Sequence, residues 1–216
     1  MNIVLLGPPG SGKGTQAEKL SDKLNLLYLQ TGDLAREWAE KNKRIKSIIE
    51  SGKLIPEKEM TAFVMQYLEE TVPPERDILF EGFPRFVSQF KSYQEWLTKR
   101  GKKIDAVIFL DSSEGAIIKR LSARRICDKC GEVYNLVTNP PKNKRVCDKC
   151  GGRLILRKDD NPDSIRIRFK YYHGNTQKLI EYLDRKGLVI KVNADRPIEV
   201  IFKDILKKLG VKSDRN

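Results

Sequence analysis

The chain has 216 residues, of which 39% are hydrophobic, and a formal net charge of +13. This length and composition fit one globular core with insertions, and no apolar stretch approaches the roughly 20 residues of a membrane-spanning helix. The positive charge allows nucleic-acid binding or attraction of small polyphosphates, but many lysines fall at polar helical positions, which indicates a solvated surface.

Strands and helices are expected to alternate along the chain. Apolar runs predict strands over residues 2–6, 26–30, 78–80, 106–110 and 188–192. Amphipathic periodicity predicts helices over residues 13–24, 57–71, 87–100, 114–123, 163–186 and 197–209. The alternation predicts an α/β fold with a parallel sheet covered by helices on both faces. Residues 30–56 and 125–160 interrupt it and are expected to be insertions at the carboxyl edge of the sheet, where ligands bind.

The glycine-rich segment 7–15, GPPGSGKGT, follows the first predicted strand directly. Its glycines let backbone N–H groups surround a phosphate, which the Lys13 ammonium can neutralise, and the Thr15 hydroxyl can reach a metal ion. Gly14 departs from the usual G-x-x-x-x-G-K-[ST] pattern, and an ordinary glycine-rich turn is the alternative. The segment predicts a nucleoside triphosphate site at Gly10, Ser11, Gly12, Lys13, Gly14 and Thr15. Because the chain begins with this strand, we expect no signal peptide and a cytoplasmic protein.

Two polar segments follow the second and third predicted strands. Residues 31–33 (TGD) precede Arg36, and residues 81–85 (EGFPR) precede Gln89, each by about one helical turn. Arginine matches phosphate through parallel hydrogen bonds, so Arg36 and Arg85 predict a second substrate that carries a phosphate.

All the cysteines lie in the second insertion, in a repeated CDKCG segment. They are Cys127, Cys130, Cys147 and Cys150. The spacing C-x₂-C…C-x₂-C is typical of a tetrahedral metal site, with zinc expected and iron as the alternative because the same ligands suit both. Two disulfide bonds are a further alternative, which a cytoplasmic chain disfavours. Four thiolates fill the coordination shell, so the site is expected to be structural.

Arginines cluster on both sides of the cysteine-bearing insertion. They are Arg120, Arg124 and Arg125 before it, and Arg157, Arg166 and Arg168 after it. Closure of the insertion over the glycine-rich segment 7–15, the P-loop, would bring these groups to the phosphates, so together they predict a clamp for phosphoryl transfer.

In their order, these motifs resemble those of the adenylate kinases over nearly the whole chain. The resemblance is carried by residues 7–15, 31–33 with Arg36, 52–55, 82–85 with Gln89, Arg120 with Arg124, 133–134, and 157–160 with Arg168. It implies a P-loop kinase core with a five-stranded parallel sheet, formed by residues 1–29, 56–123 and 161–216. It further implies an AMP-binding domain over residues 30–55 and, over 124–160, the zinc-containing LID of the long form of the family.

The resemblance implies reversible transfer of the γ-phosphoryl group of Mg²⁺-bound ATP to AMP, giving two ADP. We expect a monomer that binds neither nucleic acid nor membrane. Catalysis is expected of Lys13, Arg85, Arg124, Arg157, Asp159, Asp160 and Arg168. ATP binding is expected of the P-loop and of Arg120, Arg124, Val133, Tyr134 and Arg196. AMP binding is expected of Thr31, Arg36, Lys53, Leu54, Ile55, Gly82, Phe83, Pro84, Arg85, Gln89, Arg157 and Arg168.

Three features depart from the family pattern. Glu81 stands where aspartate is usual, and this carboxylate is expected to hold Mg²⁺ through water. Gln30 stands where serine is common, and residues 41–44 (KNKR) replace a turn that usually contains glycine. The alternatives are a kinase of another nucleoside monophosphate and a nucleic-acid-binding P-loop protein with a zinc ribbon. The second requires aromatic residues among the basic ones, and the insertion holds only Tyr134.

Overall fold

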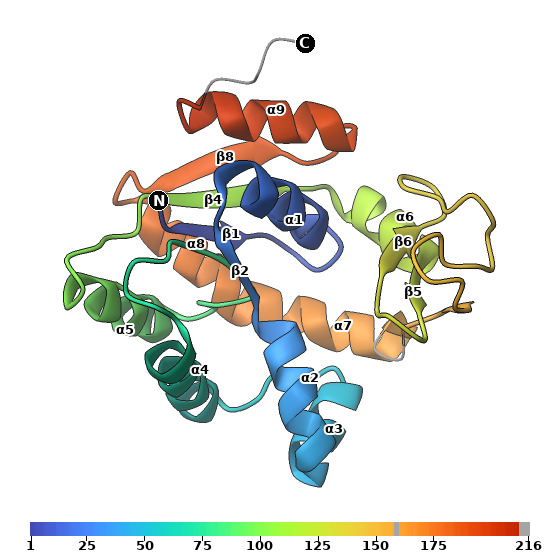
Figure 1. The fold of residues 1–216 in the computed structure, drawn as a ribbon, viewed down its shortest axis with the longest axis horizontal. Coiled ribbons are helices and arrows are strands. Elements are labelled where there is room, and N and C mark those ends of the chain that lie inside the picture. Colours follow the sequence, from blue (N-terminus) through green and yellow to red (C-terminus); the bar gives the residue numbers. More distant parts are fainter. Residues whose placement is uncertain (158–159, 212–216) are drawn as a thin grey trace.

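The computed structural model describes residues 1–157 and 160–211 and is built around a parallel sheet (Figure 1). The strand order is β2-β3-β1-β4-β8. The strands are β1 (Ile3–Leu6), β2 (Leu27–Gln30), β3 (Ile78–Glu81), β4 (Ala106–Asp111) and β8 (Val189–Asn193). The predicted α/β class and the five parallel strands are confirmed, with each end within one residue of its expected position.

The apolar run of β1 forms the centre of the molecule. β1 pairs with β3 on one side and with β4 on the other. Successive side chains of a strand point to opposite faces, so Val4 and Ile3 belong to different cores, one on each side of the sheet. Burial on both faces is why this strand reads as a continuous apolar run rather than an alternating one.

Helices cover both faces of the sheet. On one face α1 (Lys13–Leu24) and α9 (Ile198–Lys208) bury leucine and isoleucine side chains against β1 and β4. On the other face lie α4 (Glu57–Thr71), α5 (Val87–Thr98) and α8 (Gln177–Asp184). No helix among the described residues is both long enough and apolar enough to cross a membrane.

The helix predicted over residues 163–186 is interrupted. It consists of α7 (Pro162–Tyr171), a π-helical turn (Tyr172–Thr176) and α8. The turn contains Gly174 and Asn175, which are weak helix formers, and the Asn175 side-chain amide donates to the Tyr171 carbonyl at 3.1 Å. The prediction of one uninterrupted helix was therefore wrong at this turn, which apolar periodicity alone does not reveal.

The first insertion forms a pair of helices outside the sheet, α2 (Thr31–Lys41) and α3 (Lys43–Glu50). Asn42 begins α3, and its side-chain oxygen accepts from the backbone N–H groups of Arg44 and Ile45, both at 3.1 Å. A small apolar cluster around Ala35, Ala39 and Ile45 packs the pair, and Trp38 at its edge stacks on Phe63 of α4, with the ring centroids 4.5 Å apart. The prediction that residues 30–56 contain no strand is confirmed except at Gln30, the last residue of β2.

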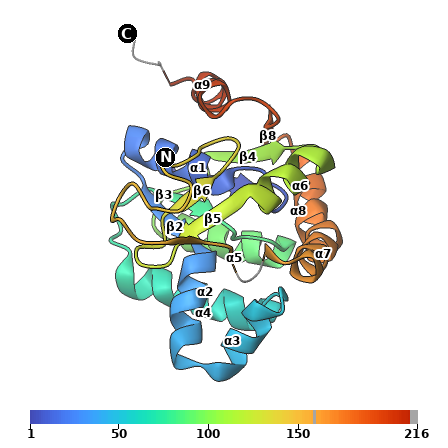
Figure 2. The ribbon, with the colours of Figure 1, turned by 90° about the vertical axis from the view of Figure 1, so that its right-hand side faces the viewer.

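The cysteine-bearing insertion contains a second, antiparallel sheet that the sequence analysis did not predict. Its strand order is β6-β5-β7, with β5 (Arg124–Cys127), β6 (Val133–Asn135) and β7 (Leu154–Ile155). Strands this short carry little periodicity. The insertion follows α6 (Glu114–Ala123), and Figure 2 shows its strand β5 in front of the central sheet.

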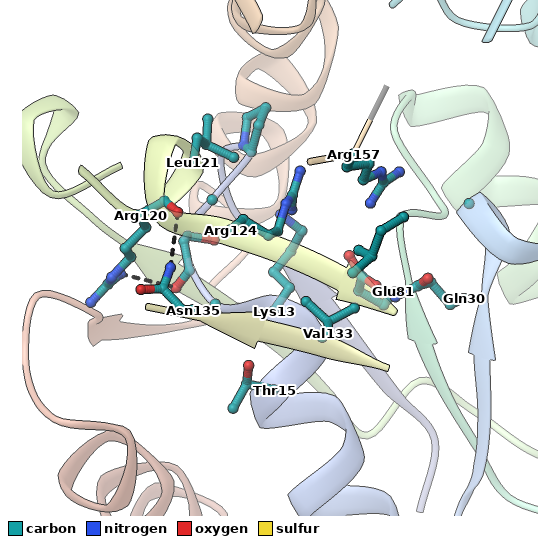
Figure 3. A pocket seen from close by; sticks show the side chains of 18 of the residues that line it. Lys13, Thr15, Gln30, Glu81, Arg120, Leu121, Arg124, Val133, Asn135 and Arg157 are labelled. Carbon is teal, nitrogen blue, oxygen red and sulfur yellow. Dashed lines mark hydrogen bonds between the residues drawn. The ribbon is translucent and has the colours of Figure 1, made fainter. Parts of the chain in front are cut away.

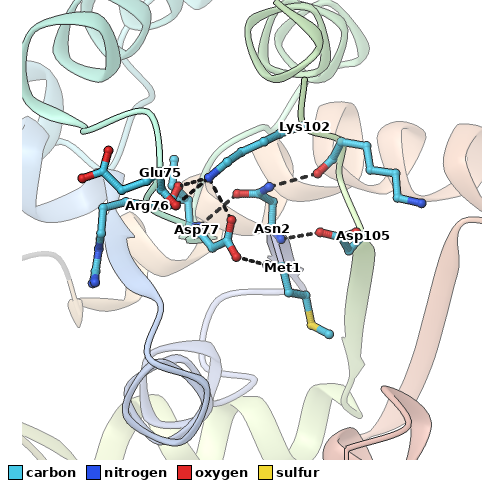
Figure 4. A network of polar contacts seen from close by, with 9 residues as sticks. Met1, Asn2, Glu75, Arg76, Asp77, Lys102 and Asp105 are labelled. Carbon is cyan, nitrogen blue, oxygen red and sulfur yellow. Dashed lines mark hydrogen bonds and ion pairs between the residues drawn. The ribbon is translucent and has the colours of Figure 1, made fainter. Parts of the chain in front are cut away.

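A polar network at the amino ends of the strands joins β1, β3 and β4 (Figure 4). The side chain of Asn2 is buried, accepts from the Ile78 N–H at 3.0 Å and donates to the Lys103 carbonyl at 3.1 Å. The Asn2 N–H donates to the Asp105 carboxylate at 2.6 Å. The network satisfies backbone groups at the edge of the sheet opposite the carboxyl ends of the strands.

Candidate functional site

A cleft of about 1390 Å³ lies at the carboxyl ends of the central strands. Its lining comes from the P-loop, from both insertions and from the loop after β8. Figure 3 shows Lys13, Arg124 and Arg157 around the same space, with Glu81 and Gln30 beside it. The cleft is thus where an open parallel sheet is expected to bind its ligands.

The P-loop approaches α6 so closely that a side chain would not fit at Gly10. Its φ is +81°, and a Cβ atom there would lie 2.9 Å from Leu121 of α6. The loop leads into the N-terminus of α1, where backbone N–H groups face the cleft and the helix dipole favours an anion. Ser11 Oγ is buried and has no hydrogen-bond partner among the described residues. An unsatisfied donor in such a loop indicates a site for a phosphate or for a metal-bound water.

Lys13 lies at the bottom of the cleft. Its ammonium group donates to the carbonyl oxygens of Gly7 at 2.9 Å and Pro8 at 2.8 Å. Burial lowers the pKa of Lys13 to about 8; Glu81 opposes this shift, while Arg85, Arg168 and Arg124 add to it. A polyphosphate bound here would favour the charged ammonium and raise that pKa again.

Glu81, at the end of β3, faces the same side of the sheet as Tyr28 and Gln30 of β2. Its carboxylate accepts from the Tyr28 hydroxyl at 3.1 Å and from the Gln30 side-chain amide at 2.6 Å. Burial and the Glu81 charge raise the pKa of Tyr28, so its hydroxyl remains a donor at neutral pH.

The loop after β3 is held by buried polar side chains. Gly82 has φ +83°, and a Cβ atom there would lie 2.6 Å from the Thr31 hydroxyl, so this position requires glycine. The Thr31 hydroxyl donates to the Glu81 carbonyl at 3.3 Å, and the Gln89 side-chain oxygen accepts from the Arg85 N–H at 2.8 Å. Arg85 Nε donates to the Gly82 carbonyl at 2.7 Å, and burial lowers the pKa of its guanidinium.

About half of the residues predicted to bind AMP line the cleft. They are Arg36, Gly82, Pro84, Arg85, Arg157 and Arg168. The others, which the structure places outside the lining, are Thr31, Lys53, Leu54, Ile55, Phe83 and Gln89. Phe83 belongs to the large core, and Ile55 belongs to the small cluster of the first insertion.

Asp160 joins two of the predicted clamp arginines. Its carboxylate is fully buried, accepts from Arg168 at 3.0 Å and accepts from Arg124 through both Nε, at 2.5 Å, and Nη2. A buried carboxylate that receives several charge-assisted hydrogen bonds holds both guanidinium groups at the cleft. Arg157 lines the same cleft, and Asp159 lies outside the described residues.

Two other arginines before and after the insertion are turned elsewhere. Arg125 donates to the carbonyl oxygens of Ser122 and Arg124, and Arg166 pairs with Asp163 at the surface. Neither contributes to the lining of the cleft.

The loop after β8 closes another side of the cleft. Arg120 donates to the Ala194 carbonyl at 2.6 Å, and Arg196 pairs with Asp204 at 2.5 Å. Asp195 accepts from the Ser112 hydroxyl at 2.6 Å and was not among the predicted site residues. Burial raises the pKa of Asp195, but the hydrogen bonds from Ser112 and Ser113 outweigh it and leave the pKa lowered.

The four cysteine sulfur atoms converge on one point, all within 4.8 Å of one another. Sγ of Cys127 and Cys150 are 3.4 Å apart, and those of Cys130 and Cys147 are 3.7 Å apart, too far for a disulfide bond. A zinc ion with Zn–S bonds of about 2.3 Å requires S–S separations of about 3.8 Å in a tetrahedron. The cluster is therefore compatible with zinc, and the disulfide alternative is wrong.

Tyr134 and Val133, which were predicted to bind ATP, line the cleft, but the Tyr134 hydroxyl faces the cysteines. It lies 3.5 Å from Cys147 Sγ and accepts from the Asp148 N–H at 3.0 Å. Tyr134 therefore links the small sheet to the sulfur cluster.

Sequence reasoning missed Tyr28, Asn135 and Asp195. Tyr28 stands two residues before Gln30, so strand periodicity places both on one face and provides a usable signal. Asn135 donates to the Arg120 carbonyl at 2.8 Å, a contact between two elements that no local pattern announces.

The chain matches the family model described as adenylate kinase over residues 5–188. An adenylate kinase from Kosmotoga olearia is 41% identical over 213 residues, which cover 97% of this chain and 99% of that protein. Adenylate kinases from Oceanobacillus iheyensis and Archaeoglobus fulgidus are 40% and 39% identical; the alignments cover 95% of this chain and 97% and 96% of those proteins. The chain therefore belongs to the adenylate kinase family.

Proposed function

We propose that this chain catalyses the reversible transfer of the γ-phosphoryl group of ATP to AMP, with two ADP as products. The observation that carries the proposal is the single cleft in which the P-loop faces Arg36 and Arg85, with the Asp160-bound arginines beside them. A second set of phosphate-binding groups opposite a P-loop fits a second nucleotide as the acceptor.

ATP occupies the P-loop side in this proposal. The backbone N–H groups of residues 10–15 and the Lys13 ammonium bind its β- and γ-phosphates. Its adenine lies between Arg124 and the loop around Arg196, with Arg120, Val133 and Tyr134 completing the site. The contacts of Arg120 and Arg196 with neighbouring carbonyl and carboxylate groups fix this loop before ATP binds.

AMP occupies the opposite side. Arg36, Arg85, Arg157 and Arg168 bind its phosphate, and residues 53–55, Thr31 and Gln89 hold its adenine and the surrounding loops. Gln89 contributes through Arg85, because its side chain accepts the Arg85 N–H from a buried position.

Transfer needs no protein nucleophile. An oxygen of the AMP phosphate attacks the γ-phosphorus in line, and ADP leaves. Lys13, Arg85, Arg124, Arg157 and Arg168 neutralise the oxygens of the migrating group, while Asp160 orients two of these arginines. Asp159 is assigned to the same group by the family resemblance.

The structure also supports a division into three functional parts. The parts are the core, 1–29, 56–123 and 161–216, the AMP-binding part, 30–55, and the LID, 124–160. Lids of this kind, the adenylate kinase lid among them, close over substrates and exclude water. We place the enzyme in the cytoplasm as a monomer, since reduced thiols suit that compartment and one chain holds both sides of the cleft.

Oxygen donors fit a Mg²⁺ ion beside the ATP phosphates. The unpaired hydroxyl of Ser11 and the Thr15 hydroxyl lie in the P-loop, and the Glu81 carboxylate borders the same cleft. Bound there, Mg²⁺ would neutralise phosphate charge, and Glu81 would hold it through water. The cysteine cluster is assigned to zinc, which four thiolates bind without an open position for substrate.

The acceptor assay tests this function. The enzyme is supplied with ATP and with AMP, UMP, CMP or GMP, and ADP formation is followed with a coupled reaction. AMP should exceed the others in kcat/KM by at least about 100-fold, because a site that hydrogen-bonds one base rejects another. A preference for UMP, CMP or GMP would instead identify a kinase of that nucleotide.

The pKa of Lys13 makes ATP binding dependent on pH. Because burial lowers the pKa of Lys13 to about 8 in the free protein, the side chain is mostly charged at pH 7.5 and mostly neutral at pH 9. ATP requires the ammonium, so binding at pH 9 should take up nearly one proton and binding at pH 7.5 far less. Calorimetry in two buffers of different ionisation enthalpy measures this uptake.

The control is Lys13→Met, which should lose the proton uptake and lower kcat by roughly 100- to 1000-fold through the missing transition-state charge. Persistent uptake in this variant at pH 9 would assign the titration to another group.

Gln89→Ala removes the acceptor of the Arg85 N–H. The KM for AMP should rise roughly tenfold while the KM for ATP stays within about twofold, because a buried donor is left unsatisfied on the AMP side alone. Gln94→Ala, an exposed position of the same helix, is the control and should change neither. Equal losses for both nucleotides would contradict the assignment of the two sides.

Replacing Cys127 and Cys130 by serine should abolish stoichiometric zinc and lower the melting temperature. Structural zinc contributes on the order of 10 kcal/mol in small peptides, and less in an insertion anchored at both ends. Turnover well below the melting temperature should persist, since the arginines lie outside the cysteine pairs. Metal analysis, calorimetry and an activity assay on one sample test this prediction. The control is Val137→Ala, at an exposed position of the same segment. Inactivity of the folded metal-free form would give the metal a part in substrate binding.

A further inference from the structure

The register between β2 and β3 brings three polar side chains together beneath the P-loop. Gln30 lies opposite Glu81 in this parallel pair, and Tyr28 stands two residues before Gln30 on the same face. The Gln30 side-chain amide donates to Tyr28 Oη at 2.8 Å and to Glu81 Oε2 at 2.6 Å, and Tyr28 donates to that same Oε2 at 3.1 Å. The two side chains thus form a closed ring of hydrogen bonds with the carboxylate.

The oxygen end of the Gln30 amide points to the side of the cleft that is proposed to bind AMP. Its side-chain oxygen accepts from Arg36 Nη2 at 3.2 Å. A carboxylate only accepts and a guanidinium only donates, so this orientation of the amide is the one that satisfies both neighbours.

The cluster lies directly against the start of α1. A Cβ atom at Gly14 would come within 3.6 Å of Gln30 Nε2 and 3.8 Å of Tyr28 Oη. The same cluster therefore contacts the P-loop at one end and Arg36 of α2 at the other. Figure 3 shows Gln30 beside Glu81 at this boundary of the cleft.

We propose that Gln30 is a positioning residue for phosphoryl transfer, whose amide N–H₂ group holds the Glu81 carboxylate and whose amide oxygen orients Arg36 for the acceptor phosphate. The proposal rests on the proposed function, because that function assigns ATP to the Glu81 side and AMP to the Arg36 side. One uncharged side chain then contacts both the carboxylate assigned to the ATP side and the guanidinium assigned to the AMP side, where Asp33 also pairs with Arg36.

This arrangement accounts for the pairing of two unusual residues. Glutamate at position 81 has one methylene more than aspartate and more rotamers to sample. The two donors from Gln30 and Tyr28 restrict it to one position. Serine at position 30 would be too short to reach Glu81 and Arg36 together, so the glutamine and the glutamate act as a matched pair.

Gln30→Met keeps the length of the side chain and removes both ends of the amide. The dissociation constant for AMP, measured by calorimetry without Mg²⁺, should rise roughly three- to tenfold, because a hydrogen bond to a partly exposed charged group is lost. The dissociation constant for ATP under the same conditions should stay within about twofold. The kcat should fall as well, since Glu81 is released. If the role of Gln30 were purely structural, the substitution would raise the dissociation constants for AMP and ATP by similar factors.

Double-mutant cycles separate the two ends. In an Arg36→Met background, Gln30→Met should no longer raise the dissociation constant for AMP, because the guanidinium through which Gln30 acts is absent. In a Glu81→Gln background, Gln30→Met should lower kcat less than in the wild type. Tyr28→Phe should lower kcat slightly and leave AMP affinity unchanged, since Tyr28 contacts Glu81 and not Arg36.

The matched control is Gln66→Met, because Gln66 also donates to a carboxylate, that of Glu70, at 2.8 Å on the exposed face of α4. It should change neither AMP affinity nor kcat. An unchanged AMP affinity in Gln30→Met, or the same fold loss in the Arg36→Met background, would overturn the proposal. If the wild type turns over another nucleoside monophosphate, the proposed function fails, and the same cycles with that acceptor still decide the role of Gln30.

Discussion

The structure depends on holding several cationic groups close together at one edge of a sheet. Lys13, Arg85, Arg124 and Arg168 interact strongly enough that their repulsion adds to the lowering of the Lys13 pKa by burial. Each group comes from a different element, so the packing between these elements, rather than one loop, resists the repulsion. Two carboxylates, Glu81 and the fully buried Asp160, offset part of it. The remaining positive potential is what draws polyphosphates into the cleft.

The central sheet could be predicted because strands buried on both faces leave continuous apolar runs, as in β1. The P-loop and the cysteine pairs could be predicted because glycine and thiolate chemistry requires fixed spacing. The bridge from Asp160 to Arg124 and the ring around Glu81 could not, because each joins residues of separate elements through the observed packing. The small sheet around β5 was also not predicted, because its strands are too short to show an alternating sequence pattern and form through pairing with their neighbours.

The two insertions are each too small for a large apolar core, and they differ in the contacts that can stabilise them. The pair α2 and α3 has a minor apolar cluster of its own, and its Trp38 stacks on Phe63 of α4, which packs in the main core. The cysteine-bearing insertion has few large apolar residues, and its cluster consists of cysteines with Tyr134 and Leu154. So small a cluster is too little apolar material for a stable fold, and a metal ion bound by the four cysteines would supply the missing stabilisation. The first insertion packs apolar side chains, whereas the second offers a four-cysteine cluster that is compatible with zinc.

The π-helical turn between α7 and α8 has a consequence for the two surfaces that this long helix serves. One additional residue in a turn rotates everything beyond it by about 100° around the helix axis. Before the turn, α7 presents Arg168 to the cleft; after it, α8 buries Leu179 and Leu183 in the main core. In an uninterrupted α-helix, the residues before and after this point would keep the same angular relation around the axis. The turn therefore changes which face of the helix points inward, so that one end lines the cleft and the other end packs in the main core.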